Sequence, residues 1–333
     1  MCGAEVARVK ATATAQSSLM CPECLKHPDY DLPALIYGHV GLGDVFYQKP
    51  AIRKFAEVEG QAVCFETLYP QVFWDAPEVH CIRRTPVFDD ERRNFERSDP
   101  KLWRERPSRP RIHRSTYGTG DYREGRTPTQ SFERHLGLEG KAGPGLFRTM
   151  LNPEWIKDWI RELPRPFGVV HPPTLRHQYA NLSRSPKPGY IQEAMDAAPE
   201  VFWVSIAALE SEKEWLAGPP LRGVGKAFDH AELCLEEVFA LVALADVALT
   251  GPCFMLPMAA SLSTPVFVVF GGNVPPHILI EPRMGDSIGG AAPDPFCACW
   301  NDQHDCSREI DGVGEKFKAF LEKRCLHADP RPR

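Results

Sequence analysis

Apolar runs alternate with amphipathic stretches in two separate parts of the chain. Apolar runs predict strands and amphipathic stretches predict helices. In the first part, strands are predicted at Ala34–Tyr37, Ala62–Glu66 and Val79–Ile82, and helices at Pro50–Glu59 and Tyr69–Asp75. In the second part, strands are predicted at Phe167–His171, Val201–Ile206, Val247–Leu249 and Val266–Phe270. Helices are predicted between them, at Tyr190–Ala198, Ser211–Leu216, Cys234–Ala243 and Leu256–Ser261. Strands that alternate with helices indicate parallel sheets, so two similar α/β halves are expected.

A basic segment separates the two parts. Between Arg83 and Arg134 there are 14 Lys and Arg against 9 Asp and Glu, a net charge of +5, which leaves −10 for the rest of a chain whose total is −5. Five prolines fall in the same window. We expect loops and short helices over a surface here, ending in a helix near Thr129–Leu136. An amphipathic helix is expected at Pro153–Leu163, before the linker Pro164-Arg165-Pro166.

These boundaries predict a weakly ordered lead-in at residues 1–30 and two α/β domains. The N-terminal domain is expected at residues 31–163, with the basic insert at 83–134, and the C-terminal domain at 164–333. A charged helix at Glu315–Arg324 is expected to pack back across the domain boundary. Ligands of α/β proteins prefer the cleft between such halves, so the functional site is expected there.

The composition is that of a folded protein of ordinary charge. The 333 residues are 43% hydrophobic with a net charge of −5, which allows two cores and argues against nucleic-acid binding by the whole chain. No apolar run reaches the roughly 18 residues of a membrane-spanning helix, and the first 20 residues contain no apolar signal core. Eleven cysteines without a secretion signal indicate reduced thiols and a cytoplasmic location.

A glycine turn after the first predicted strand is the strongest candidate for chemistry. It reads Gly38-His39-Val40-Gly41-Leu42-Gly43-Asp44, and its spacing differs from the dinucleotide-binding pattern Gly-x-Gly-x-x-Gly. Glycines let the backbone approach a ligand closely, and Asp44 stands at the edge where open α/β sheets bind ligands. Asp44 is therefore a candidate general base. The alternative is an acid that only complements the dipole of a helix N-terminus.

Two groups of cysteines have ligand-like spacing for a metal. One is the pair Cys21 and Cys24; the other is Cys297, Cys299 and Cys306, with His304 nearby. A structural zinc site needs four such ligands that meet in space, so both groups are weak candidates, and free thiols in loops are the alternative. Cys253 has no histidine near it in the sequence and is not indicated as a nucleophile.

The motifs resemble the ADP-heptose:lipopolysaccharide heptosyltransferase type of glycosyltransferase. That family shows Gly-[Leu/Met]-Gly-Asp-Val followed by Pro-Ala-Leu-Arg, and this chain has Gly41-Leu42-Gly43-Asp44-Val45 and Pro50-Ala51-Ile52-Arg53. A second similarity runs from Leu233 to Gly272 and includes Ala245-Asp246-Val247, Gly251-Pro252, Ala259-Ala260 and Pro265-Val266-Phe267. A looser third one comprises Arg176, Asn181, Arg184-Ser185-Pro186 and Tyr190.

The resemblance implies a GT-B fold, with two Rossmann-like domains that face each other across a cleft. It implies an inverting, metal-independent transfer of a sugar from a nucleotide-sugar to the hydroxyl of a glycan or lipid-linked core, with the nucleotide-sugar as co-substrate and no other cofactor. Asp44 would be the base. The donor would contact Arg176, Arg184, Glu232, Thr250, Gly251 and Pro252, and the acceptor would contact Gly41, Gly43, Tyr117 and Tyr122.

Two alternatives remain open. The basic insert, with Trp103, Tyr117 and Tyr122 among its arginines, would also suit a sugar transferase that acts on modified bases in DNA. In addition, the turn after Gly251-Pro252 reads Cys253-Phe254-Met255-Leu256-Pro257-Met258, where relatives carry an acid, glycines and a histidine. This departure would suit a non-catalytic protein that binds a nucleotide or carbohydrate through a degenerate donor site.

Overall fold

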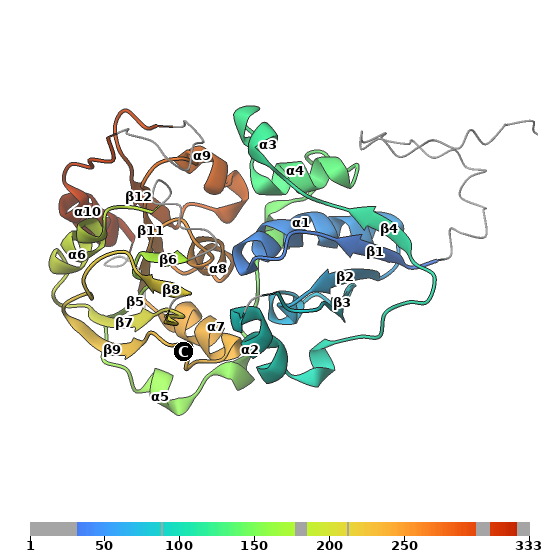
Figure 1. Ribbon diagram of the computed structural model, residues 1–333, viewed down its shortest axis with the longest axis horizontal. Helices are drawn as coiled ribbons and strands as arrows, with labels where there is room; N and C mark the ends of the chain where they lie inside the picture. Colours follow the sequence, from blue (N-terminus) through green and yellow to red (C-terminus); the bar gives the residue numbers. More distant parts are fainter. Residues whose placement is uncertain (1–31, 88, 177–184, 212, 298–306, 325–333) are drawn as a thin grey trace, which may run out of the picture.

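The computed structural model describes residues 32–87, 89–176, 185–211, 213–297 and 307–324. They form two parallel sheets that lie side by side, the earlier one on the right of Figure 1 and the later one on the left. Within these ranges, every helix falls short of the length and apolar character needed to cross a bilayer.

The first sheet has four parallel strands in the order β3-β2-β1-β4. The strands are β1 (Ala34–Tyr37), β2 (Val63–Thr67), β3 (Val79–Arg83) and β4 (Arg111–Arg114). The expectation that the basic insert stays out of the sheet is wrong at β4, which pairs with β1 so that Ile36 lies beside His113. Its sequence, Arg-Ile-His-Arg, carries no apolar run because β4 is an edge strand whose side chains are half-buried or exposed.

The second sheet has six parallel strands in the order β12-β11-β10-β5-β7-β9. They are β5 (Phe167–Val170), β7 (Phe202–Ile206), β9 (Val224–Phe228), β10 (Val247–Thr250), β11 (Val266–Val269) and β12 (Ile288–Ala291). This is the order of a doubly wound Rossmann sheet, in which the direction of winding reverses between β5 and β10. A separate antiparallel ribbon joins β6 (Thr174–Arg176) to β8 (Glu214–Leu216).

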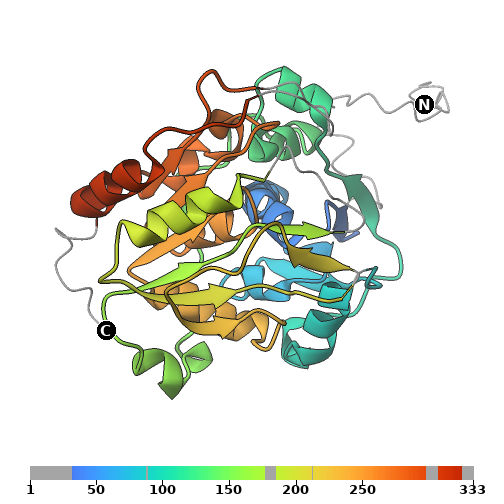
Figure 2. The same cartoon turned by 60° about the vertical axis from the view of Figure 1, so that its left-hand side comes forward.

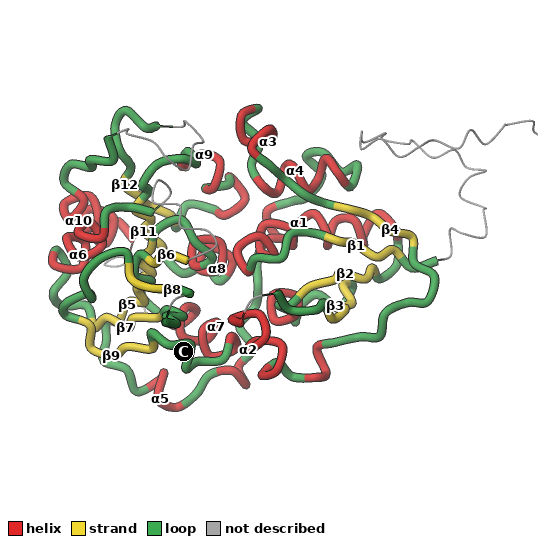
Figure 3. The backbone as a smooth tube through the Cα atoms, viewed as in Figure 1, coloured by secondary structure: helices red, strands yellow, loops and turns green. Residues whose placement is uncertain are grey.

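Helices connect and cover the strands. They are α1 (Leu42–Glu59), α2 (Asp89–Arg97), α3 (Thr119–Arg123), α4 (Pro128–His135), α5 (Asp158–Arg161), α6 (Pro188–Asp196), α7 (Leu235–Leu244), α8 (Met255–Ser261), α9 (Pro276–Leu279) and α10 (Val313–Arg324). Short 3₁₀ turns lie at η3 (Pro70–Phe73), η4 (Pro100–Leu102), η5 (Pro144–Phe147), η6 (Pro153–Trp155) and η8 (Pro282–Met284). Figure 3 shows that loop predominates between α2 and β4.

Four expected helices differ in the structure. Tyr69–Asp75 contains only the turn η3, and Pro153–Leu163 is divided into η6 and the short α5. Ser211–Leu216 contributes β8 instead of a helix, because its residues pair with Thr174–Arg176, a partner that local periodicity does not reveal. The last helix, α10, packs on α6 and β12 of the second sheet and does not cross to the first (Figure 2).

Helix α1 packs against the first sheet and also against helices α7 and α8 of the second half. The Phe46 ring stacks on Phe239 of α7 with centroids 5.6 Å apart, and Trp155 packs on the other side of Phe239 at 5.4 Å. Residues from both sheets therefore share one continuous apolar core. Lys49 lies near the middle of α1, and its buried ammonium pairs with Asp75 at 2.8 Å and donates to the Thr149 hydroxyl at 2.8 Å. These contacts tie α1 to the connection between the sheets.

Phe239→Ala tests this shared core. The Phe239 side chain is fully buried, so its removal should lower the free energy of unfolding by about 3–5 kcal/mol. Urea denaturation followed by circular dichroism measures the change. The matched control is Val58→Ala on the solvent side of α1, where the side chain is 59% exposed and the expected change is within about 0.5 kcal/mol. Equal effects of the two substitutions would contradict the packing described.

Candidate functional site

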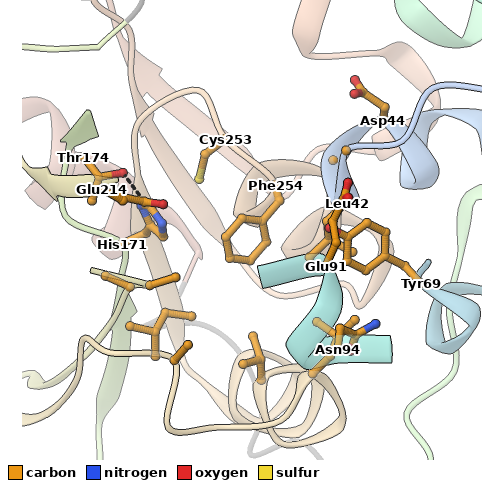
Figure 4. A pocket seen from close by; sticks show the side chains of 18 of the residues that line it. Leu42, Asp44, Tyr69, Glu91, Asn94, His171, Thr174, Glu214, Cys253 and Phe254 are labelled. Carbon is orange, nitrogen blue, oxygen red and sulfur yellow. Dashed lines mark hydrogen bonds between the residues drawn. The ribbon is translucent and has the colours of Figure 1, made fainter. Parts of the chain in front are cut away.

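The site lies where the winding of each sheet reverses. In the first sheet the reversal falls between β1 and β4, and in the second between β5 and β10. Open α/β sheets bind ligands beyond the carboxyl ends of the strands at such points. The segments that follow these four strands line a single cleft of about 840 Å³, which is large enough for a nucleotide-sugar (Figure 4).

One buried amide fixes the loop between β1 and α1. The Gln48 side chain is fully buried, and its Oε1 accepts from the His39 backbone N–H at 3.1 Å. Its Nε2 donates to the backbone oxygens of His39 at 3.0 Å and Asp44 at 3.1 Å. The loop that carries Asp44 is therefore held by a residue of the same helix, one turn further on.

Asp44 is hydrogen-bonded to Tyr117, which follows β4. The Tyr117 hydroxyl donates to Asp44 Oδ1 at 2.5 Å. Burial first, and then the negative charge of Asp44, raise the pKa of Tyr117 well above its ordinary value, so the hydroxyl remains a donor at ordinary pH. The Tyr117 ring packs on His39 at 4.4 Å, and the Tyr117 backbone N–H donates to His39 Nε2 at 3.0 Å. This arrangement orients one oxygen of the carboxylate.

Two glycines of the turn are required by close approaches. A Cβ at Gly41 would lie 2.7 Å from Asp44 Oδ2, and a Cβ at Gly43 would lie 3.2 Å from the Cα of Phe254, which follows β10. Gly43 thus allows the first turn of α1 to touch the loop that follows β10 in the second sheet. The two glycines keep the carboxylate in place and let the two halves meet.

Across the cleft, His171 follows β5 and Cys253 follows β10. Figure 4 shows His171 directly beside Glu214, with Cys253 and Phe254 on the side toward Asp44. The Cys253 thiol interacts electrostatically with His171, and its Sγ lies 3.0 Å from Thr250 Oγ1. No histidine lies near Cys253 in the sequence, but the parallel order of β5 and β10 brings His171 to the same part of the cleft.

The β6–β8 ribbon places an ion pair beside His171. Glu214 accepts from the Thr174 hydroxyl at 2.7 Å through Oε1 and pairs with Arg176 Nε at 2.7 Å through Oε2. Glu214 is buried, whereas the Arg176 side chain is 43% exposed and lines the cleft. The Arg176 guanidinium is thus held by Glu214 through Nε and forms part of the cleft lining.

Helix α2 of the basic insert spans one side of the cleft. Arg93 pairs with Glu210 at 3.3 Å, and Arg97 Nη1 donates to the Ala231 backbone oxygen at 2.8 Å. Lys213 adds ion pairs to Asp89 and Glu210. The insert therefore links the first half to loops of the second and adds two arginines, Arg93 and Arg97, to the lining.

The structure brings together part of the residue set suggested by the sequence. Asp44, Gly41, Gly43, Tyr117, Arg176 and Pro252 line the cleft. Thr250 and Gly251 are buried behind the lining, and Tyr122 packs on Tyr117 at 5.2 Å. Glu232 is exposed, accepts from the His230 backbone N–H at 2.8 Å and is not itself part of the lining, although its neighbours Ala231 and Leu233 are. Arg184 lies outside the described residues.

The metal candidates are only partly described. Cys297 is half-buried, and its backbone oxygen accepts from Asn273 at 3.1 Å. Cys21, Cys24, Cys299 and Cys306 lie outside the described residues. In the part of the chain that the structure describes, no three His, Cys, Asp or Glu side chains come together as a metal site.

Sequence reasoning did not find several lining residues. His171 follows an apolar strand directly and His39 follows one after a single glycine, which is the signal that could have identified them. Glu214 carried no such signal, because β8 was expected to be a helix. Arg93 and Arg97 were counted among the charges of the insert but not placed in the cleft.

No protein-family model matches the sequence, and no curated protein matches it significantly. Solved structures do match. The chain is similar to the iron-containing dodecameric glycosyltransferase TibC from enterotoxigenic E. coli H10407, with a TM-score of 0.59, 16% identity and coverage of 88% of this chain and 76% of that one.

It is also similar to the E. coli ADP-heptose LPS heptosyltransferase II, with a TM-score of 0.52, 13% identity and coverage of 89% and 99% of the two chains. The chain has the GT-B fold of the heptosyltransferases. At these identities the similarity shows the fold, and it confirms the fold expected from the glycine turn and the Gly-Pro motif.

Gly41→Ala tests how Asp44 is held. The added methyl would overlap Asp44 Oδ2, so the carboxylate should turn away and its contact with Tyr117 should lengthen beyond about 3.2 Å in a crystal structure of the variant. Gly120→Ala is the matched control, since a Cβ there meets no heavy atom within 4 Å. An unmoved Asp44 in the first variant would show that the turn does not position it.

Proposed function

We propose that this protein is an inverting, metal-independent glycosyltransferase that moves a sugar from a nucleotide-sugar to an acceptor hydroxyl. The observation that supports it best is the placement of Asp44. In a heptosyltransferase fold, its carboxylate lines the cleft opposite the point where the second sheet reverses its winding. One oxygen is held by Tyr117, which leaves Oδ2 to accept a proton.

The proposed reaction uses that oxygen as the base. The acceptor hydroxyl lies within hydrogen-bonding distance of Oδ2 and gives up its proton as its oxygen attacks the anomeric carbon. The bond from that carbon to the diphosphate breaks on the opposite face, so the configuration inverts. Tyr117 keeps Oδ1 occupied and so directs the single free oxygen at the acceptor.

The second half would bind the donor. Arg176 offers a guanidinium that forks onto phosphate oxygens, and the turn at Gly251 and Pro252 brings backbone close to the same wall. Positive charge there would stabilise the leaving diphosphate. Arg184 stays a predicted second clamp. Because a matched TibC structure contains ADP-D-β-D-heptose, ADP-sugars are the first donors to assay.

The acceptor is proposed to be an anionic glycan or glycolipid. Support comes from Arg93 and Arg97, which place positive charge on the cleft wall beside the first half. Modified DNA is the alternative acceptor. Assays with both classes distinguish them, since a phosphate-backbone acceptor should lose affinity steeply as salt rises.

Asp44→Asn tests the base. The amide cannot accept the proton, so turnover with the correct donor should fall by about 10²–10⁴-fold while donor affinity changes little. Radiolabelled sugar transfer measures the first quantity and calorimetric titration the second. Asp158→Asn, at a carboxylate that is 89% exposed, is the control and should be silent. Turnover of Asp44→Asn within a few-fold of the parent protein would exclude this role.

Arg176→Gln tests donor binding. A nucleoside diphosphate at about 100 times its dissociation constant should stabilise the parent protein by about 2.7 kcal/mol, and the variant should lose much of this effect. Thermal unfolding with and without ADP and UDP measures it. Arg161→Gln, at a 60% exposed arginine away from the cleft lining, should keep the full effect. If no nucleotide stabilises the parent protein, the non-catalytic alternative is favoured.

A further inference from the structure

Cys253 and His171 form a pair that the proposed transfer reaction does not use. They stand at the carboxyl ends of β10 and β5, the two strands between which the second sheet reverses its winding. Both side chains line the cleft and are only half-buried, so small molecules that enter the cleft can reach them. Figure 4 shows the sulfur directed toward the imidazole.

Three groups surround the sulfur. His171 interacts with it electrostatically, the Thr250 hydroxyl lies 3.0 Å from it, and the Met255 backbone N–H donates to it at 3.5 Å. The imidazole and the backbone N–H can both donate to a thiolate, whereas the Thr250 hydroxyl also donates to the Gly251 backbone oxygen at 3.0 Å.

The charges around the pair favour its ionised form. Burial opposes ionisation of both groups, but the His171 charge and the hydrogen bonds outweigh it and lower the pKa of Cys253 below its ordinary value. In the same way the Cys253 charge, and then the Glu214 carboxylate, outweigh burial and raise the pKa of His171. The charge of Arg176 opposes this increase in the pKa of His171, but the Arg176 guanidinium is itself paired with Glu214 at 2.7 Å.

A second thiol in the same cleft has the opposite environment. Cys234 also lines the cleft and is half-buried. Burial raises its pKa to about 12, and the neighbouring carboxylates of Glu236 and Glu237 add to the increase. Cys234 is therefore a thiol of similar access but without a cationic partner, and it provides an internal reference.

We propose that Cys253 and His171 form a thiolate–imidazolium pair, and that this pair makes the donor side of the cleft a modification site for hydroperoxides. The thiolate attacks one oxygen of the peroxide, an S–O bond forms and the O–O bond breaks. The sulfur is oxidised by two electrons to a sulfenic acid, and the peroxide is reduced. The departing oxygen takes the proton of the imidazolium and leaves as water or an alcohol. His171 thus supplies both the charge that stabilises the thiolate and the proton for the leaving group.

This proposal does not depend on glycosyl transfer. It requires only the pair and an open path to it, so a protein that fails to bind nucleotides would still show it. Oxidation would convert a thiolate into a larger sulfenic acid beside Pro252, in the wall proposed for the donor.

Site-resolved alkylation tests the pair. The reduced full-length protein is treated with iodoacetamide at pH 7, and mass spectrometry follows the peptides of Cys253 and Cys234 separately. A thiolate at Cys253 should react at least about tenfold faster than Cys234, because reactivity follows the thiolate fraction. His171→Gln, which removes the charge, should slow Cys253 by about tenfold and leave Cys234 unchanged. Equal rates at the two cysteines, or no effect of His171→Gln in a folded variant, would overturn the proposal.

The pH profile of the parent protein provides a test that needs no variant. The alkylation rate of Cys253 should reach half its maximum clearly below about pH 8.5, the value for a free thiol, and should fall only as the pH drops through that lower midpoint. Hydrogen peroxide followed by dimedone should then label Cys253 ahead of Cys234. A midpoint at or above that of a free thiol, or preferential labelling of Cys234, would show that the pair is not ionised.

Discussion

The packing of α1 on the first sheet and on helices α7 and α8 of the second half is the contact on which the rest of the structure depends. Phe46 stacks on Phe239, and Gly43 approaches the backbone of Phe254, so the helix that carries Asp44 also touches the loop that carries Cys253. All strands of each main sheet run parallel, and each sheet therefore presents its loops at one edge. With α1 joining the first sheet to α7 and α8, the two points where the winding reverses face each other across one cleft.

The two sides of the cleft are held by different forces. On the α1 side the contacts are apolar and buried. Two polar contacts supplement them: Oε1 of the buried Glu281 accepts from the Thr129 backbone N–H at 2.8 Å, and Arg283 pairs with Glu133 at 2.9 Å. On the α2 side the contacts are exposed or half-exposed ion pairs, such as Arg93 with Glu210. Exposed pairs are weak and are screened by salt, so we expect any opening of the cleft to occur on the α2 side.

The sequence predicted what depends on local pattern. Apolar runs marked most strands, and the turn Gly41-Leu42-Gly43-Asp44 marked the start of α1 and the carboxylate that lines the cleft. It did not predict β4 or β8, because an edge strand such as Arg111–Arg114 and a short ribbon such as Glu214–Leu216 depend on partners far along the chain. The proximity of Cys253 to His171 was missed for the same reason, since only the order of β5 and β10 makes them neighbours.

The most direct test of the central claim is a crystal structure of the protein with an unreactive ADP-sugar analogue. The account predicts that the diphosphate lies beside Arg176 and Pro252, and that the sugar extends toward Asp44 with room for one acceptor hydroxyl about 3 Å from Oδ2. A nucleotide bound away from the β5–β10 edge, or a sugar that points away from Asp44, would contradict it.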